Sequence, residues 1–476
     1  MYLRKVILKN IKCFSHLEID FRKDNNVRLW TTLFGKNGLG KSTLLQAMGA
    51  VLAGPSAVRE LLPVAEGWVK IGKPYGEIYA EILWSDGDAT KEGRKRKSKP
   101  YIMQYVVGGG NSSQLPETLE EKPSVTELVP WSGSESPKTK ESLTKDRKLL
   151  QQTAYAEGQE GWLACGYGPF RRLSGGSEAS NSIVAAERRA ARFVTLFKED
   201  AALTNATKWL TDLHNTARDG DKENQRVLER VKTAIAENLF PEPAELIVNA
   251  RAAYLRRGCS SQILFQDLSD GYRSMLTLCI DLLRWLVKAF PNQSDPLTRP
   301  GVALIDELDA HLHPSWQRTI GYWLREKFPK IQFIIATHSP FIAQVADPDS
   351  EADEAGGPDE AASTGNIRLE ETPDGVVAKP SAESARQLRP EQILRSDLFG
   401  MESVLAPPVE DQIEQFKALH RKRKKGPLAG TEAQQYEQLA LELERLPQGL
   451  TPEERTREKV IQNAVRKHSD QISQLE

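Results

Sequence analysis

The stretch GKNGLGKST, residues 35–43, has the glycine spacing of a phosphate-binding loop. Glycines let backbone N–H groups approach phosphate oxygens, and a helix that starts behind the loop adds a favourable dipole. A plain glycine-rich hairpin is the alternative, but this stretch follows a strand pattern and opens a helical one, as a phosphate loop requires. We therefore expect ATP to contact Gly35, Lys36, Asn37, Gly38, Leu39, Gly40, Lys41, Ser42 and Thr43.

Two other stretches carry side chains suited to phosphoryl transfer, and both follow apolar runs. In VALIDE, Asp306 and the Ser42 hydroxyl are suited to hold Mg²⁺, and Glu307 is suited to polarise an attacking water. In IIATHS, a lone histidine is more often structural, but beside the strand of Asp306 it can reach the γ-phosphate. The catalytic residues expected from this pattern are Lys41, which neutralises the phosphates, Glu307 and His338.

A further polar turn, LSDGYRS at residues 268–274, opens a long apolar helix. Read alone it is a capped helix start, because serine and aspartate both cap helix N-termini well. The Ser269 hydroxyl and the Gly271 backbone, with the dipole of the following helix, also suit an anion. A single chain cannot easily bring this turn onto its own phosphate loop when the two lie on separate lobes. We therefore expect Ser269 and Gly271 to act in trans, on the γ-phosphate held by a second copy across a two-fold interface.

The elements that must position these residues alternate between strands and helices. Three N-terminal strand patterns precede the phosphate loop, and the apolar runs GVALIDE and IQFIIATHS flank a helix that begins near Pro314. Continuous apolar strands joined by a helix imply a parallel sheet that is buried on both faces. Between residues 182 and 238 the pattern is helical, and two strand patterns follow it before LSDGYRS.

Composition suggests where the chain divides. Residues 1–84 hold the N-terminal strands and the phosphate loop, and residues 85–150 read as a flexible insertion around one strand, YIMQYVV. Residues 151–345 hold the helical lobe, LSDGYRS and the two apolar runs. Residues 346–385 read as an acidic linker and a hairpin with Asp-Gly at its turn. Residues 386–476 are polar and helical and suit contact with a partner or another copy. That last region also has a short apolar stripe that suits packing within a helical bundle: Tyr436, Leu439, Leu443 and Leu446.

The chain has 476 residues and a formal net charge of -1, so contact with nucleic acid would need a local basic patch. The four cysteines form no CxxC pair, which disfavours a zinc site or a disulfide framework and suits a reducing cytoplasm. The N-terminus carries too many charges for a signal peptide, and no apolar run approaches the length of a membrane span. These features predict a cytoplasmic protein with no membrane segment.

The order of GKNGLGKST, LSDGYRS, ALIDELDAHLHP and ATHS resembles the ABC-type ATPases of the RecF, SMC-like and OLD branch. The resemblance implies an α/β fold: an ATPase head with a mixed, largely parallel sheet and an antiparallel N-terminal β subdomain, a helical lobe and a helical C-terminal extension. It also implies that Lys12 and Phe14, in ILKNIKCF, lie near the base or ribose of ATP. Three positions depart from the family pattern: Asp270 and Tyr272 replace Gly and Gln in the signature, and His313 replaces the Asp of the D-loop.

Features that are absent from the sequence distinguish between the families of this branch. It has no long heptad block or CxxC hook for an SMC-type arm, and no Toprim-like nuclease region after His338. A compact ATPase with a helical tail containing LRPEQILRSDLFGMES is similar to the PtuA family, the ATPases of the Septu anti-phage defence system. That resemblance implies a homo-oligomer, at least a dimer, that hydrolyses ATP to ADP and phosphate. It also implies a separately encoded HNH nuclease, a PtuB-like subunit, as the partner.

Two other functions fit parts of the sequence. A RecF-like repair ATPase would bind DNA through local basic runs such as GRKRKSK and HRKRKK, although charge runs are usually only solvated. An ABC transporter subunit is disfavoured by the long insertion, the N-terminal strands and the HLHP ending. Among single residues, Gln104 is one candidate for the glutamine that connects the lobes. One of the two neighbouring arginines, Arg171 or Arg172, is a candidate for contact with phosphate. The alternative is that the two form an ordinary surface pair, since exposed arginines are common.

Overall fold

The computed structural model describes the chain except residues 24–25, 86–99, 109–128, 131–139, 159, 174, 204, 241, 259–261, 292, 294, 347–364, 382–383, 429 and 445–476. The chain forms two compact units, residues 1–400 and residues 401–476. The basic run GRKRKSK, Cys259 and Leu446 lie outside the described residues.

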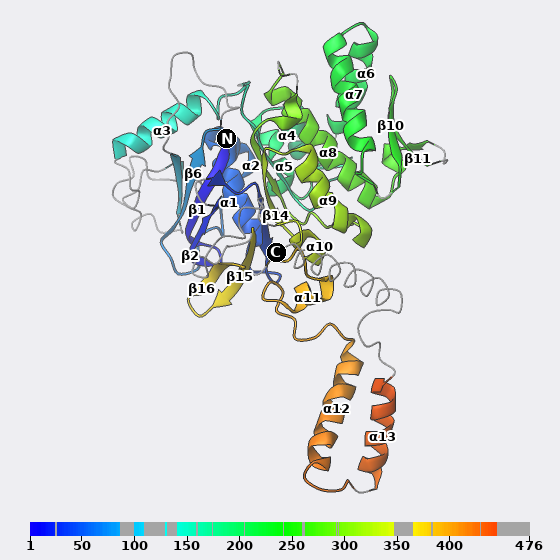
Figure 1. The fold of residues 1–476 in the computed structure, drawn as a ribbon. Coiled ribbons are helices and arrows are strands. Elements are labelled where there is room, and N and C mark those ends of the chain that lie inside the picture. Colours follow the sequence, from blue (N-terminus) through cyan, green and yellow to red (C-terminus); the bar gives the residue numbers. More distant parts are fainter. Residues whose placement is uncertain are drawn as a thin grey trace, which may run out of the picture. The chain divides into compact units, whose positions relative to one another are not determined.

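The larger unit is built on a six-stranded sheet with the order β16-β15-β5-β14-β13-β9 (Figure 1). Neighbouring strands from β15 to β9 run parallel, and β16 runs antiparallel to β15. The predicted mixed, largely parallel sheet is thereby confirmed. Its strands are β5 (Trp30–Phe34), β9 (Ala164–Tyr167), β13 (Gly301–Ile305), β14 (Ile331–Ala336), β15 (Asn366–Thr372) and β16 (Gly375–Pro380).

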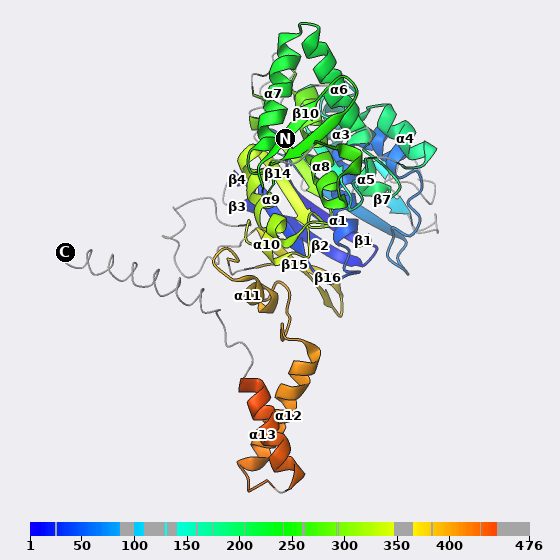
Figure 2. The ribbon, with the colours of Figure 1, turned by 90° about the vertical axis from the view of Figure 1, so that its right-hand side faces the viewer.

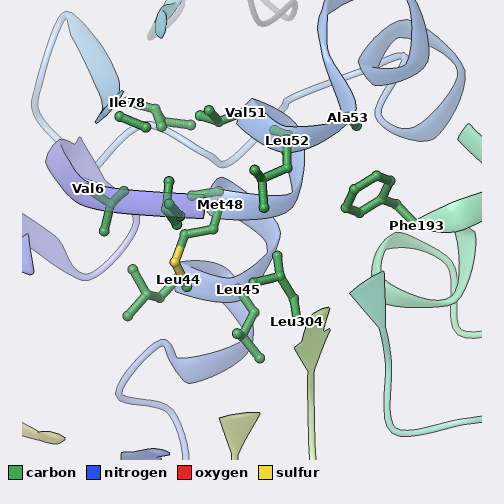
Figure 3. Packing of buried hydrophobic residues seen from close by; sticks show 14 of the residues in the cluster. Val6, Leu44, Leu45, Met48, Val51, Leu52, Ala53, Ile78, Phe193 and Leu304 are labelled. Carbon is green, nitrogen blue, oxygen red and sulfur yellow. The ribbon is translucent and has the colours of Figure 1, made fainter. Parts of the chain in front are cut away.

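The central strands β13 and β14 are buried on both faces. Leu304 and Ile334 belong to the core that surrounds α1 (Lys41–Ala53), whereas Ile305 and Ile335 belong to the core beneath α8 (Asp270–Ala289) and α9 (Pro314–Lys327). This alternation explains why both strands read as continuous apolar runs. Figure 3 shows the first core, where Leu44, Leu45 and Met48 of α1 lie close to Leu304 and Val6.

A second, antiparallel sheet covers the other side of α1, with the order β2-β1-β6-β7-β8. Its strands are β1 (Tyr2–Ile11), β2 (Phe14–Asp20), β6 (Tyr75–Leu83), β7 (Tyr101–Gly108) and β8 (Val129–Pro130). Every residue of β7 is buried, and the helix α3 (Lys140–Gln152) packs against this strand. The expected flexible insertion of residues 85–150 therefore contributes one strand to the core, because β7 pairs with β6 along its whole length.

Side chains of α8 and α9 share one hydrophobic core with the large sheet and with the helical lobe (Figure 2). The lobe contains α6 (Asn205–Arg218), α7 (Lys222–Ala236) and a small antiparallel sheet of β10 (Ala244–Val248), β11 (Ala253–Arg257) and β12 (Ile263–Leu264). The other elements of this unit are short: α2 (Pro55–Leu61), α4 (Glu178–Ala185), α5 (Val194–Phe197), α10 (Pro340–Ala343), α11 (Pro390–Arg395), β3 (Arg22–Lys23) and β4 (Asn26–Val27).

The larger unit extends past residue 386, where the sequence suggested that a separate helical region begins. Ile393 of α11 and Leu398 are buried in one cluster with Phe34 of β5 and Ala343 of α10. The hairpin β15–β16 also joins the large sheet, since β15 pairs with β5. Residues up to Gly400 therefore belong to the larger unit rather than to a separate C-terminal region.

The second unit is a helical hairpin of α12 (Pro407–Arg423) and α13 (Thr431–Glu444). Phe416 stacks on Tyr436 with 4.8 Å between the ring centroids, and Leu419 and Leu439 are buried. The apolar stripe thus packs within this hairpin as far as the structure describes it. None of the described helices is both long and apolar enough to cross a membrane.

Candidate nucleotide-binding site

The phosphate loop joins β5 to α1, as the sequence predicts. Gly40 precedes the helix with a φ of +86°, a left-handed conformation that favours glycine. A Cβ at this position would lie 2.6 Å from Cys13 Sγ and 2.6 Å from Phe14 Cζ. Both its conformation and its packing against the β1–β2 turn therefore require glycine here.

Lys41 is buried at the first turn of α1, with 8% of its surface exposed. Its Nζ donates hydrogen bonds to the carbonyl oxygens of Gly35 at 2.7 Å and Lys36 at 3.3 Å. Burial lowers the pKa of Lys41 from its ordinary value. Carboxylates nearby oppose this shift in pKa: Asp306, Glu307 and Asp309. The ammonium group therefore lies where the loop and the carboxyl end of β13 meet.

Asp306 follows β13 and is 3% exposed. Its Oδ1 is buried and makes no hydrogen bond with any described residue. Burial raises the pKa of Asp306, while a hydrogen bond with Ser42 lowers it. A buried carboxylate oxygen without a partner, next to the phosphate-loop hydroxyl, fits a hard cation such as Mg²⁺. No cluster of three or more His, Cys, Asp or Glu side chains suited to a metal occurs in the described residues, but Mg²⁺ bound with a nucleotide takes other ligands from phosphates and water.

Glu307 is exposed and has a φ of +47°, which is uncommon for a residue other than glycine. Arg171, which follows β9, stabilises this turn by hydrogen bonds to its backbone. The Arg171 guanidinium donates from Nη2 to the Glu307 carbonyl oxygen at 2.8 Å and from Nη1 to the Asp306 carbonyl oxygen at 3.4 Å. Its Nε donates to Ser274 Oγ of α8 at 3.0 Å. Arg171 is thus a buried residue, 4% exposed, and not a member of a surface pair.

His338 follows β14 and lies close to the carboxylates of Glu307 and Asp309 and to Lys41. Burial of part of the ring lowers the pKa of His338, and the positive charge of Lys41 lowers it further. Asp309 holds the segment in place, because its Oδ1 accepts hydrogen bonds from the Thr337 hydroxyl and, at 3.3 Å, from the His338 backbone N–H. Asp309 was not among the residues expected at this site, although it stands two residues after Glu307 in the stretch DELDAHLHP.

The signature turn lies at the start of α8. Ser269 is the N-cap residue and is exposed, but its side chain does not cap the helix and makes no hydrogen bond with a described residue. No hydrogen bond or ion pair joins Ser269 or Gly271 to the phosphate loop in the part of the chain that the structure describes. The Ser269 side chain therefore lies exposed at the helix N-terminus without capping it.

Two of the three departures from the family pattern, Tyr272 and His313, have structural roles within the chain. Tyr272 packs between Phe240 and Trp316, with ring centroids 5.1 Å and 4.2 Å away, and its hydroxyl donates to Glu242 Oε1 at 2.9 Å. His313 is the N-cap of α9, where its Nδ1 accepts a hydrogen bond from the Ser315 backbone N–H at 3.3 Å. Both side chains are used for packing or capping inside one chain.

Three other residues that were expected to have functional roles belong to the antiparallel sheet or to its turns. Lys12 is in the β1–β2 turn, one residue from Cys13, and its ammonium group stacks over Trp68 at 5.1 Å from the ring centroid. Phe14 is fully buried beneath Gly40, so its ring belongs to the core and is not free to contact a base. Gln104 lies in β7 of the antiparallel sheet, paired with Tyr79, and does not connect the two lobes.

Comparisons with known proteins agree with an ATPase domain. Residues 1–96 match the family described as "AAA ATPase domain", and residues 133–343 match the family described as "AAA domain, putative AbiEii toxin, Type IV TA system". The chain is 28% identical over 344 residues to Septu protein PtuA of Bacillus mycoides (strain KBAB4), which covers 71% of this chain and 38% of that protein.

Shorter matches join the chain to two retron proteins. It is 46% identical over 82 residues to the Retron Vc95 probable ATPase of Vibrio cholerae, and 41% identical over 105 residues to the Retron Ec83 probable ATPase of Escherichia coli. These matches cover 17% and 22% of this chain and 16% and 18% of the relatives. The chain therefore spans well under half of the length of these curated relatives.

Among solved structures, an SMC head bound to the C-terminal winged-helix domain of ScpA is 15% identical, with a TM-score of 0.47 over 80% of this chain and 98% of that one.

Proposed function

We propose that this chain, an ABC-type P-loop ATPase with Septu PtuA and retron ATPases among its relatives, is the ATP-binding and hydrolysing subunit of an anti-phage defence complex in the cytoplasm. One observation carries the proposal: Lys41, Ser42, Asp306, Glu307 and His338 come from three separate stretches and meet at the carboxyl edge of one parallel sheet. That edge is where open α/β sheets bind their ligands.

Each of the chain's own site residues would have a separate role in hydrolysis. Lys41 would move from the loop carbonyls to the β- and γ-phosphates and neutralise their charge. Ser42 and Asp306 would hold Mg²⁺, which when bound neutralises charge that develops on the phosphates. Glu307, exposed at the end of the turn, would orient and polarise the attacking water, and His338 would contact the γ-phosphate.

Two copies are proposed to close head to head on ATP. The unused Ser269 hydroxyl at the N-terminus of α8 supports this arrangement, since it is suited to the γ-phosphate bound by the other copy. The closing and opening cycle would regulate a separately encoded HNH nuclease, which is the kind of partner expected from the resemblance to the Septu ATPases. An HNH reading frame next to this chain's gene is the expected finding, and a membrane permease in that place would contradict the proposal.

Variants of Lys41 and Glu307 test the hydrolytic part of the proposal. Lys41→Ala should lose ATP binding, because the phosphates lose their buried cation. Glu307→Gln should bind ATP as the parent chain does but turn it over about 100-fold more slowly or worse, the usual cost of losing a general base. ATP binding is measured by equilibrium titration and turnover by phosphate release.

Lys222→Ala, at the exposed start of α7, serves as the control and should leave both quantities unchanged. Turnover by Glu307→Gln at the rate of the parent chain would remove Glu307 from its role. ATP binding by Lys41→Ala at the parental affinity would place the nucleotide elsewhere.

A further inference from the structure

A cleft of about 880 Å³ lies beside the signature helix, between α6, the β10–β11 turn and the segment that follows β9. No residue of the phosphate loop lines it. Its volume is within the range of small-ligand sites in proteins. The cleft is therefore separate from the phosphate loop, although Asp270, Arg273 and Ser274 of the signature turn form part of its wall.

The lining of this cleft is strongly basic, although the chain as a whole has a formal net charge of -1. Five cationic side chains line it: Arg171, Arg172, Lys208, Arg251 and Arg273. The one carboxylate in the lining, Asp270, is already paired with Arg273. This concentration of positive charge selects for an anion.

Three of these cations are exposed and form no ion pair with a described residue: Arg172, Lys208 and Arg251. Arg251 is presented by a tight turn, in which Asn249 Oδ1 accepts hydrogen bonds from the backbone N–H groups of Arg251 and Ala252, both at 2.9 Å. Lys208 comes from α6 and Arg172 from the segment after β9. Cations from three separate elements thus face one cleft without forming an ion pair there, and among the described residues only Lys208 has a further carboxylate, Glu187, close enough to interact with its charge. Three such cations suit several phosphates and not a single one.

The cleft also offers an aromatic surface. The Phe170 ring is 36% exposed, and the Arg172 guanidinium lies 5.3 Å from its centroid. An exposed aromatic ring next to unpaired cations is the combination that binds bases by stacking and the backbone by charge. We propose that this cleft binds single-stranded nucleic acid, with Phe170 stacking on a base and Arg172, Lys208 and Arg251 contacting successive phosphates.

The test uses the full-length chain carrying Lys41→Ala, so that ATP binding at the phosphate loop and closure on ATP do not contribute. The probe is a fluorescently labelled oligothymidylate of about 12 nucleotides, a length in the range that one single-strand binding domain covers. Affinity is measured by fluorescence anisotropy between about 50 and 200 mM salt. The measurement is independent of the proposed ATPase activity, so either proposal can fail alone.

Removing the three unpaired cations together, as Arg172→Ala, Lys208→Ala and Arg251→Ala, should weaken binding at least tenfold. It should also reduce the slope of log affinity against log salt by about 2, since each phosphate contact on a single strand contributes about 0.7. The matched control removes three exposed cations of the same lobe and the same net charge: Lys222→Ala, Arg226→Ala and Arg256→Ala. The control should bind within twofold of the parent, and Phe170→Ala alone should weaken binding about tenfold.

Equal losses in the cleft variant and the control would overturn the proposal, because they would assign binding to diffuse surface charge. Displacement of the probe by ATP or inorganic phosphate at an equal concentration of phosphate groups would also overturn it, in favour of a free phosphate ligand. A duplex of the same length that binds as well as the single strand would overturn the assignment to unpaired nucleotides. A uridylate oligomer of the same length distinguishes RNA from DNA as the source of the strand.

Discussion

At the scale of a single side chain, Arg171 links the turn that carries Asp306 and Glu307 to α8. It is the buried donor to the carbonyl oxygens of Asp306 and Glu307 and to the Ser274 hydroxyl on the signature helix. Burial lowers the pKa of Arg171 to about 10, and the negative charges around the turn oppose that shift. The guanidinium therefore stays charged at neutral pH, and its planar fork fixes the left-handed turn that carries Glu307.

Arg171→Lys tests this positioning role. A lysine keeps the charge but cannot reach three acceptors in a fork, so Glu307 should lose its orientation while the phosphate loop is untouched. We expect kcat for ATP to fall about tenfold, which corresponds to about 1.4 kcal/mol, and KM to stay within twofold. Arg226→Lys on the exposed face of α7 is the control. An equal change in kcat and KM, or a change in KM alone, would speak against positioning of Glu307.

At the scale of elements, the start of α8 and the loop after β13 depend on each other's shape. Gly271, in the first turn of α8, is buried against the loop backbone, and a Cβ at this position would lie 2.5 Å from the His311 carbonyl oxygen. His311 itself has a φ of +64°. The glycine of the signature is thus needed inside one chain, whatever the same turn does in a second copy.

Gly271→Ala should therefore destabilise the larger unit by roughly 1–3 kcal/mol. The reason is that neither the start of α8 nor the loop after β13 can move away from the added methyl group without strain. Thermal unfolding followed by circular dichroism measures the effect. Gly426→Ala is the matched control, since no atom would lie within 4 Å of its Cβ. An unchanged melting temperature for Gly271→Ala would mean that the loop yields more easily than the packing implies.

At the scale of the whole molecule, the proposed closure of two heads would depend on Ser269. Ser269→Arg places a bulky cation at the exposed N-terminus of α8, where the helix dipole disfavours positive charge and the larger side chain blocks the approach of another copy. In the Glu307→Gln background, ATP should produce a dimer when Ser269 is retained and should fail to produce one when Ser269→Arg is added. Light scattering with and without ATP makes the comparison.

ATP affinity should stay within twofold in the Ser269→Arg variant, because the side chain does not touch its own phosphate loop. A dimer that forms equally well with and without the substitution would remove Ser269 from the interface.

The division of the chain into two units gives a second prediction at this scale. A chain that ends after residue 400 keeps Ile393 and Leu398 in their cluster with Phe34, whereas a chain that ends after residue 385 loses both side chains. The longer truncated chain should unfold at the temperature of the parent chain. The shorter one should lose about 3 kcal/mol or more of stability, because two side chains no longer cover Phe34. Equal melting temperatures for the two truncated chains would return the boundary to residue 386.

The sequence by itself determined the parts of the protein whose chemistry is local. The glycine spacing before Lys41, the apolar run before Asp306 and the run before His338 each specify a strand end or a helix start within a few residues. The places of these three residues in the fold could therefore be predicted from neighbours along the chain. The parallel pairing of β13 and β14 followed from the same apolar runs, whereas the mixed character of the sheet was implied by the family resemblance.

Tertiary structure alone decided the features that join distant stretches. The burial of Arg171 depends on α8 and on the turn after β13, both more than a hundred residues away along the chain. β7 looked like part of an insertion because its flanking residues are polar, yet pairing with β6 buries it. The basic cleft likewise exists only because three elements bring Arg172, Lys208 and Arg251 to one place. Contacts between segments that are far apart in sequence leave no periodic signal in either segment, and packing alone reveals them.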